Sequence, residues 1–148
     1  MLIYRMEDEA GRGPFYGTAW PVLGWEEFRK FVAEITASSR AIAETLNDLR
    51  YGSASRRWER LERDFGRPPI FGAPDLECFE RWFPLRYRRL YVAAGFRPVV
   101  YDVPAKAVEM GTSEAERMFI PVGPKRPLDP ETLEPLESAL SGAGADWQ

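Results

Sequence analysis

Residues 96–103 read FRPVVYDV, and this stretch is the clearest β-strand signal in the chain of 148 residues. β-Branched and aromatic side chains fit a pleated, half-buried surface, so the run favours a core strand. Pro98 has no backbone N–H, which favours a start at a sheet edge or just before the paired region. A second β-rich run is at the N-terminus, where residues 1–6 read MLIYRM. We expect this N-terminal strand to lie centrally in one mixed or antiparallel sheet, paired with late strands.

The residues between these two strands are expected to be helical. Over residues 25–50, apolar side chains from Phe28 to Leu49 recur at helical spacing, which predicts the longest helix. Shorter helices are expected at residues 56–65, 76–83 and 85–94. Asp75 suits the N-cap of the second of these. The residues expected to face inward from the first two short helices are Trp58, Leu61, Phe65, Leu76, Phe79, Trp82 and Phe83.

The order of the elements predicts the fold class. Brief strands are expected at residues 69–72 and 117–122. Because strands and helices do not alternate as βαβα, the class is α+β: a small mixed or antiparallel sheet with helices inserted between the first and the late strands. We expect residues 1–123 to form a single α+β domain. Residues 124–148 are expected to be a Pro-rich C-terminal appendage with a short amphipathic helix that begins at Asp129.

The lack of histidine and the presence of a single cysteine exclude several kinds of enzyme mechanism and metal site. The chain has no histidine, so it lacks the commonest general base and the usual imidazole metal ligand. It has one cysteine, Cys78, and therefore forms neither an internal disulfide nor a thiolate zinc cluster. We expect no bound metal. Cys78 lies on the inward stripe of its helix, which predicts a buried, structural thiol.

The distribution of apolar and charged residues indicates where in the cell the protein is expected to be. No apolar run approaches the roughly 20 residues that span a bilayer. The first ten residues include Glu7, Asp8 and Glu9, unlike a basic secretory leader. We therefore expect a cytoplasmic protein without a membrane partner.

Charge is uneven along the chain, whose formal net charge is −3. Residues 50–97 carry 11 arginines and no lysine against 6 acidic residues. The planar fork of arginine suits phosphate and carboxylate groups, so this Arg-rich block is a candidate for binding nucleic acid or another phosphate. The competing interpretation is that interleaved arginines and acids, as at residues 56–64, form solvated pairs on a helix surface.

Three local features are candidates for carrying chemistry. Arg5 lies inside the N-terminal strand, either on its solvent face or in a cleft that holds an anion. Glu114 and Glu116, spaced i and i+2 on an extended segment, project to the same side and perturb each other, unless they belong to an ordinary acidic loop. Ser53 and Ser55 lie in a small-residue turn between helices, most simply a linker with serine caps.

The order of these three features resembles the R-S-E pattern of the mono-ADP-ribosyltransferase fold. The most specific part is SEAERMFIPVG at residues 113–123, a Glu-x-Glu followed by hydrophobic residues, proline and glycine. The resemblance implies an ADP-ribosyltransferase-like core with NAD as cofactor. It implies Glu116 as the catalytic glutamate and Glu114 as the upstream acid of the pair. The residues implied to bind NAD are Arg5, Tyr4, Ser53 and Ser55.

A second resemblance covers more of the chain. Its segments are IYR and GRGPFYG within residues 3–17, FGAPDLECFERWF at 71–83 and GFRPVVYDVPAKAV at 95–108. Together with the final strand they look like small proteins found in phages and prophages. This resemblance implies a location in the host-cell cytoplasm.

The two resemblances leave different classes of function open. One is NAD-dependent mono-ADP-ribosyl transfer to a host protein or nucleic acid. Another is a non-enzymatic phage or prophage inhibitor, of anti-defence type, that binds a host protein. Direct nucleic-acid binding by residues 50–97 is a third, although a sequence pI near 5.2 opposes it globally. The enzyme requires Arg5 and Glu116 on neighbouring strands, both facing one open cleft.

Overall fold

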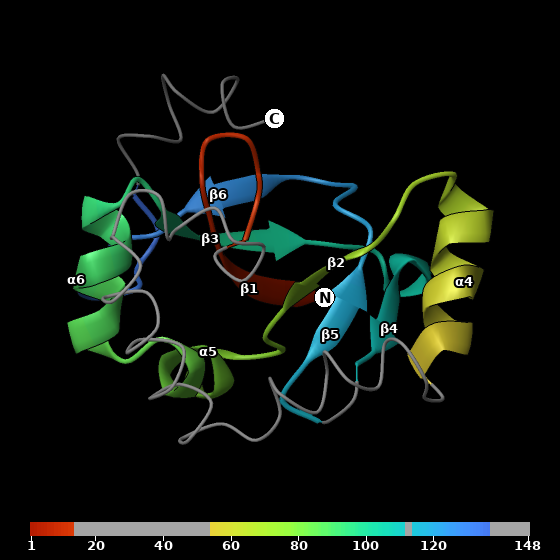
Figure 1. Cartoon of the computed structure of the whole chain (residues 1–148), viewed down its shortest axis with the longest axis horizontal. Helices are drawn as coiled ribbons and strands as arrows, with labels where there is room; N and C mark the ends of the chain where they lie inside the picture. The colour runs from red at the N-terminus through yellow and green to blue at the C-terminus, as the bar shows by residue number, and fades with distance from the viewer. Residues whose placement is uncertain (14–53, 112–113, 137–148) are drawn as a thin grey trace.

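The structure, a computed structural model, describes residues 1–13, 54–111 and 114–136. These residues form the α+β fold that the sequence predicts (Figure 1). The helices are α4 (Ala54–Phe65), α5 (Leu76–Trp82) and α6 (Leu85–Ala93), with a 3-10 turn at Ala105–Ala107. The strands are β1 (Leu2–Glu7), β2 (Ile70–Gly72), β3 (Arg97–Asp102), β4 (Val108–Met110), β5 (Arg117–Phe119) and β6 (Lys125–Pro127). The long helix predicted over residues 25–50 lies outside the described residues.

The described strands form two antiparallel sheets of three strands, in the orders β1-β3-β6 and β2-β5-β4. β1 pairs with β3 from Leu2 opposite Asp102 to Glu7 opposite Arg97, which confirms the predicted pairing of the first strand with a late one. The central position predicted for the first strand is wrong, because β6 pairs with the other side of β3 and leaves β1 at the edge of its sheet.

The two sheets are joined at Tyr4. Its backbone N–H donates to the carbonyl of Ala73, 2.9 Å away, and the N–H of Ala73 donates back over 2.8 Å. Gly72 lies beside this bridge, packed so closely on Ile3 and on the carbonyl of Tyr4 that a side chain there would collide with both. A residue without a Cβ is therefore required where β2 approaches β1.

Pro98 is placed differently from the sequence prediction. It lies opposite Met6, inside the paired region of the central strand β3. Its carbonyl accepts a hydrogen bond from the N–H of Leu128 at 2.9 Å. Pro98 has no N–H to donate back to Leu128, and the β3–β6 ladder ends one pair earlier, at Val99 opposite Pro127.

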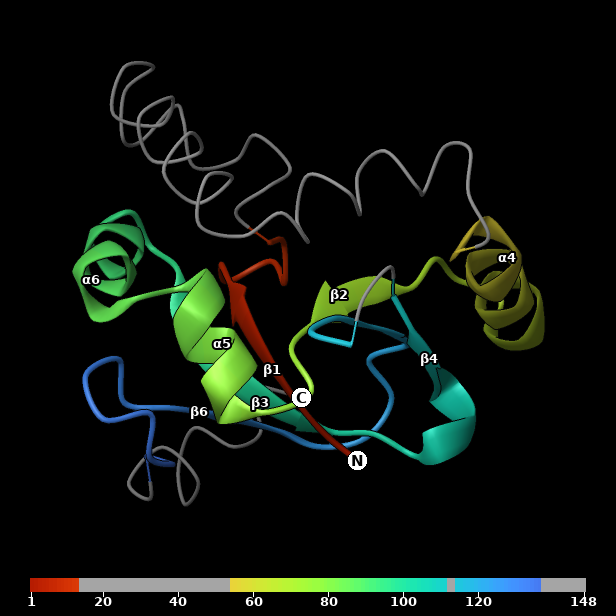
Figure 2. The same cartoon turned by 90° about the horizontal axis from the view of Figure 1, so that it is seen from below.

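Two apolar clusters hold the helices against the sheets. Leu61 of α4 is fully buried against the second sheet, and Trp58 and Phe65 pack beside it, as the helical spacing predicts. At the other end of the molecule, α5 and α6 pack on the side of β1 (Figure 2). The buried residues of that cluster are Met6, Ala73, Cys78, Phe79, Trp82, Phe83, Tyr91, Phe96 and Leu133.

Helix α5 begins where the sequence predicts. The Asp75 carboxylate accepts the N–H of Cys78 at 2.8 Å and so caps the first turn. Cys78 is buried, as predicted, and burial raises the pKa of its thiol. The inward position predicted for Leu76 is wrong: 38% of its surface is exposed, because the first residue of the helix points away from the cluster.

Residues 125–136 pack on the domain core. β6 pairs with β3, and Leu133 is buried in the cluster beneath α5 and α6. Residues 129–136 form a turn rather than the predicted helix. The Asp129 carboxylate accepts two backbone N–H groups, and Leu133 then takes a φ of +62°, which a helix does not continue. The division of the chain after residue 123 stays a prediction.

Candidate functional site

A buried ion pair lies on one face of β1. Arg5 and Glu7 are two residues apart on the strand, so their side chains point the same way. The Arg5 Nε donates to the Glu7 carboxylate over 3.1 Å, and neither side chain exposes more than 6% of its surface. The rest of the guanidinium donates to the carbonyl of Phe71 at 2.7 Å and of Gly11 at 3.0 Å. Arg5 therefore joins β1 to β2 and to the turn after β1.

The Glu7 carboxylate has two further partners, from β3 and β6. The Tyr101 hydroxyl donates to it over 2.8 Å, and the Lys125 ammonium over 2.6 Å. Burial, together with the charge of Glu7, raises the pKa of the Tyr101 hydroxyl far above its usual value. Tyr101 consequently keeps its proton and serves as a hydrogen-bond donor. A fully buried carboxylate is stable here because three donors surround it.

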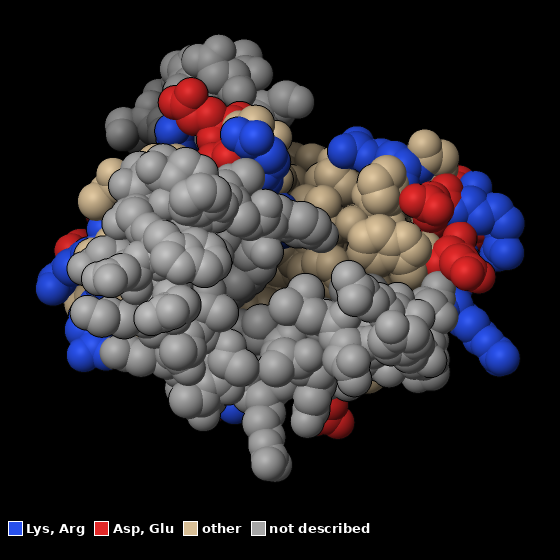
Figure 3. All heavy atoms as spheres, viewed as in Figure 1, with Lys and Arg blue, Asp and Glu red and all other residues tan. Residues whose placement is uncertain are grey.

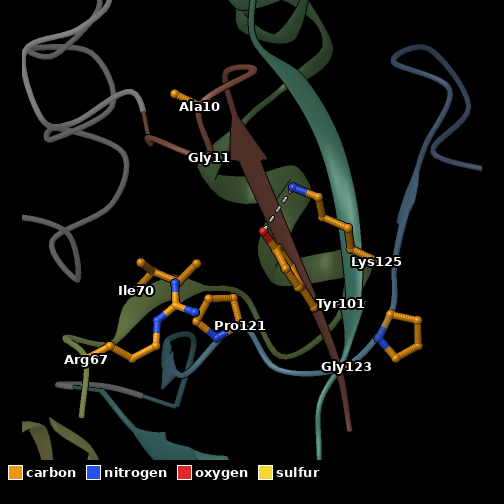
Figure 4. Close-up of a pocket in the computed structure, with 9 residues that line it drawn as sticks. Ala10, Gly11, Arg67, Ile70, Tyr101, Pro121, Gly123 and Lys125 are labelled. Atoms are coloured by element: carbon orange, nitrogen blue, oxygen red, sulfur yellow. Dashed lines mark hydrogen bonds between the residues drawn. The ribbon is translucent and has the colours of Figure 1, made fainter. Parts of the chain in front are cut away.

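A pocket opens beside this network, with a volume of about 490 Å³. Figure 4 shows Lys125 and Tyr101 on one side of it and Arg67 on the other, next to Ile70 and Pro121. The volume lies within the range of about 300–1,000 Å³ that is usual for small-molecule sites.

Arg67 reaches the pocket because of the way α4 ends. Gly66 follows the last helical residue with a φ of +69°, the left-handed conformation that commonly ends a helix. The next residue, Arg67, lines the pocket, and Pro68 and Pro69 follow it, which prevents further helix. Within the part of the chain that the structure describes, Arg67 has neither a hydrogen bond nor an ion pair.

The electrostatics of the described site favour an anion. Glu7 is the shared counter-charge of Arg5 and Lys125, so these three side chains carry one net positive charge, and Arg67 adds a second at the pocket. Arginine and lysine are the side chains that recognise phosphate and carboxylate groups. Across residues 1–13, 54–111 and 114–136, no group of three or more acidic or cysteine side chains is placed to hold a metal ion.

The two candidate carboxylates have different surroundings. Residues 114 and 115 form a turn, so the extended segment predicted to align Glu114 with Glu116 is absent, and that expectation is wrong. Glu114 is exposed. Glu116 is 2% exposed and lies against Gly111, whose N–H donates to its carbonyl over 3.0 Å. The catalytic roles implied for both residues stay predictions.

The structure does not place Arg5 and Glu116 on neighbouring strands. Glu116 directly precedes β5, β5 pairs with β2, and the end of β2 adjoins β1. The solvent-face alternative for Arg5 is wrong, because Arg5 is buried and paired with Glu7, and the alternative of a cleft that holds an anion stays a prediction. Tyr4 is half-buried beside Ala73, and Ser55 falls in the first turn of α4. Ser53 lies outside the described residues, and the NAD-binding roles of this set stay predictions.

Of the charged residues at the pocket, only Arg67 was among the sequence candidates, as part of the Arg-rich block at residues 50–97. Glu7 counted there only as part of an acidic N-terminus, although an opposite charge two residues from Arg5 on a strand is a signal for a buried pair. Lys125 is one of three lysines in the chain. Tyr101 lies in the clearest strand signal, and nothing in that signal marks its hydroxyl.

Several arginines of the Arg-rich block hold its helices to later parts of the chain where the structure describes them. Arg57 donates to the carbonyl of Met110 at 2.9 Å, and Arg60 donates to the Glu109 carboxylate at 2.6 Å. Basic and acidic side chains lie side by side over α4 (Figure 3). The pair of Arg60 and Asp64, 3.4 Å apart on the surface of α4, is of the solvated kind that the competing interpretation predicts. Nucleic-acid binding by residues 50–97 stays a prediction.

The fold and the pocket define a small α+β protein with a basic cavity between its two sheets. The family model described as Bacteriophage T4 Y00F protein matches residues 1–119, and the chain belongs to this phage protein family. The match confirms the resemblance to phage proteins, and its description names no activity. No curated protein and no solved structure matches the chain significantly.

The family match includes β1 to β5 and thus Glu7, Arg67 and Tyr101, and it ends before Lys125. Among the described residues, no helix is long and apolar enough to cross a membrane.

Proposed function

We propose that this phage-family protein is a non-enzymatic binding protein of the infected cell's cytoplasm, and that its pocket takes up an anionic group of the ligand. One observation carries the proposal: Arg67 and Lys125 line the same cavity, while the nearby carboxylate, Glu7, is already bound by three donors. An anion supplies the charge that this site lacks.

The strength of such a site follows from its charges. Two unit charges 4 Å apart attract by about 4 kcal/mol at the effective dielectric constant typical near a protein surface. Loss of ligand freedom and of hydration opposes this gain. We therefore expect inorganic phosphate alone to bind with a dissociation constant on the order of 1 mM.

Thermal unfolding in phosphate tests the proposal. At ten times the dissociation constant, a ligand stabilises the folded state by about 1.4 kcal/mol, which raises the melting temperature by a few degrees. Phosphate, compared with chloride at equal ionic strength, is expected to stabilise the wild type and to have little effect on Arg67→Ala. Arg63→Ala is the matched control, since Arg63 is an exposed arginine of α4 that contacts only its neighbour Asp64 among the described residues. Equal stabilisation of all three proteins would refute the proposal.

A host protein is the second candidate ligand, favoured by the outer face of α6. Arg86, Arg89, Leu90 and Ala93 are exposed and spaced i, i+3, i+4 and i+7, which places them on one stripe. Helix α6 itself lies at the end of the molecule away from α4 (Figures 1 and 2). Arginine beside an exposed apolar side chain is a common composition of protein interfaces.

Purification of tagged protein from host extract tests this second candidate. Leu90→Glu is expected to lose a bound host protein that the wild type retains. Val92→Glu, at a similarly exposed apolar position of α6 off the stripe, is expected to retain it. Retention by Leu90→Glu, or loss from both variants alike, would refute a role for the stripe.

ADP-ribosyl transfer from NAD is the enzymatic alternative, and the geometry supports it less well. Its anion-binding arginine would have to be Arg5, which is buried and bonded to Glu7 and to two carbonyls. Its catalytic glutamate would be Glu116, which is separated from β1 by β2. Transfer of label from NAD to a protein in host extract, abolished in Glu116→Gln, would establish the enzyme instead.

A further inference from the structure

We infer that the ligand of the pocket is a phosphomonoester with a compact organic body, of the size of a nucleoside monophosphate. Its phosphate lies between Arg67 and Lys125, and its organic body lies against Ile70 and the neighbouring prolines. This inference deepens the proposed function and rests on it. It adds the chemical class of the ligand to the expectation that an anion binds.

The size of the cavity allows a ligand larger than a free phosphate. One water molecule occupies about 30 Å³ of liquid, and a phosphate ion has only five heavy atoms. A cavity of about 490 Å³ therefore leaves most of its volume for other atoms of the ligand. Pockets of this volume usually enclose most of the surface of a small organic molecule.

The residues that line the pocket determine whether the organic part of the ligand is apolar or charged. Ile70 of β2, Pro121 after β5 and Pro124 before β6 contribute apolar surface, and proline has no N–H to donate. In Figure 4, Arg67 lies beside Ile70 and Pro121, so a phosphate on its guanidinium has this apolar wall next to it. An uncharged, planar or apolar body fits such a wall better than a second charged group does.

The charges favour phosphate over a single carboxylate. Arg67 presents a planar fork of donors, and Lys125 presents an ammonium whose bond to Glu7 is 2.6 Å long. A phosphomonoester carries a charge between about −1.5 and −2 at pH 7 and has three acceptor oxygens. Its charge matches the two cations that line the pocket, whereas a carboxylate offers one charge to two cations.

The residues that line the pocket come from separate parts of the chain. Arg67 follows α4, Lys125 belongs to β6, and Gly11 lies in the turn that the Arg5 guanidinium holds. Arg5 holds the turn at Gly11 and Glu7 holds Lys125, so these two parts of the site are formed before the ligand arrives, whereas Arg67 has no such contact among the described residues. Such preorganisation lowers the cost of binding.

Calorimetric titration of the full chain with adenosine monophosphate, inorganic phosphate and adenosine tests the inference. We expect the monophosphate to bind more tightly than phosphate by about tenfold or more, and adenosine to show no measurable binding. Arg67→Ala is expected to weaken both phosphate-bearing probes by about tenfold. Ile70→Thr, which keeps the β-branched shape, is expected to weaken only the monophosphate. Arg63→Ala is expected to bind like the wild type.

The outcomes separate the two proposals. Equal affinity for the monophosphate and phosphate, both lost in Arg67→Ala, would overturn the inference and leave the anion-binding function intact. Binding of adenosine as tightly as the monophosphate would overturn both proposals, because the phosphate would then contribute nothing. Absence of binding by all three probes would likewise overturn both.

Discussion

Substitution of Glu7 by glutamine tests the network beneath the pocket. Glutamine keeps the shape of the side chain and removes its charge, which leaves Arg5 and Lys125 as two cations without their common counter-charge. Removing one partner of a buried ion pair costs about 3–5 kcal/mol. Lys125 retains 18% exposure and can turn to water, so we expect the lower end of that range, about 3 kcal/mol.

The assay is urea unfolding followed by the fluorescence of the 5 tryptophans. The matched control is Glu131→Gln, because Glu131 pairs with Arg89 over 2.9 Å on the exposed surface, where loss of a pair costs about 0–1 kcal/mol. Lys125→Met, combined with Glu7→Gln, is expected to destabilise by less than the sum of the single changes, because the two groups interact directly.

A loss below about 1 kcal/mol for Glu7→Gln, equal to that of the exposed control, would refute the reasoning. It would mean that the Glu7 carboxylate is not the buried counter-charge of Arg5 and Lys125. An additive double variant would also contradict the direct contact between Glu7 and Lys125.

Two substitutions and one labelling measurement test the fold that supports the site. Gly72→Ala is expected to cost about 2 kcal/mol in urea unfolding, because its Cβ would lie 2.8 Å from the carbonyl oxygen of Tyr4; unchanged stability would contradict the close approach of β2 to β1. Asp75→Ala is expected to cost about 1 kcal/mol at neutral pH. The hydrogen bond from the Cys78 N–H lowers the pKa of Asp75, so its stabilisation is present above about pH 4 and is lost as the pH falls through the lowered value. If the wild type remains more stable than Asp75→Ala by the same amount in strong acid, the ionised Asp75 carboxylate is not the source of the stabilisation. Cys78 is expected to react slowly with a mild thiol reagent in the native protein and rapidly in urea; rapid native labelling would contradict its burial.

The sequence predicts elements whose signals are local. The run at residues 96–103 is apolar and β-branched, Asp75 is a strong N-cap, and Gly66 follows an amphipathic stripe. Each of these signals depends on a few neighbouring residues, and the structure has a strand, a helix start and a helix end at those places. The pairing of the first strand with a late one could also be predicted, because the backbone N–H and C=O groups of a strand need hydrogen-bond partners from another strand.

The pocket depends on contacts that no local signal contains. Glu7, Tyr101 and Lys125 come from three strands, and the registers of β1 on β3 and of β3 on β6 bring them together. β6 is a three-residue strand that reads KRP, and because proline and charged residues are not typical of strands, the sequence does not predict it. The turn at residues 114–115 likewise separates two carboxylates that alternation alone would align.

The most direct test of the central claim, an anion site between Arg67 and Lys125, is a phosphate titration of uniformly labelled protein followed by its backbone amide NMR signals. We predict that the amides of the pocket residues Gly11, Ile70 and Gly123 shift together and saturate, and that Arg67→Ala abolishes these shifts while leaving the rest of the spectrum in place. Shifts confined to other surfaces, or shifts at the pocket that persist unchanged in Arg67→Ala, would contradict the claim.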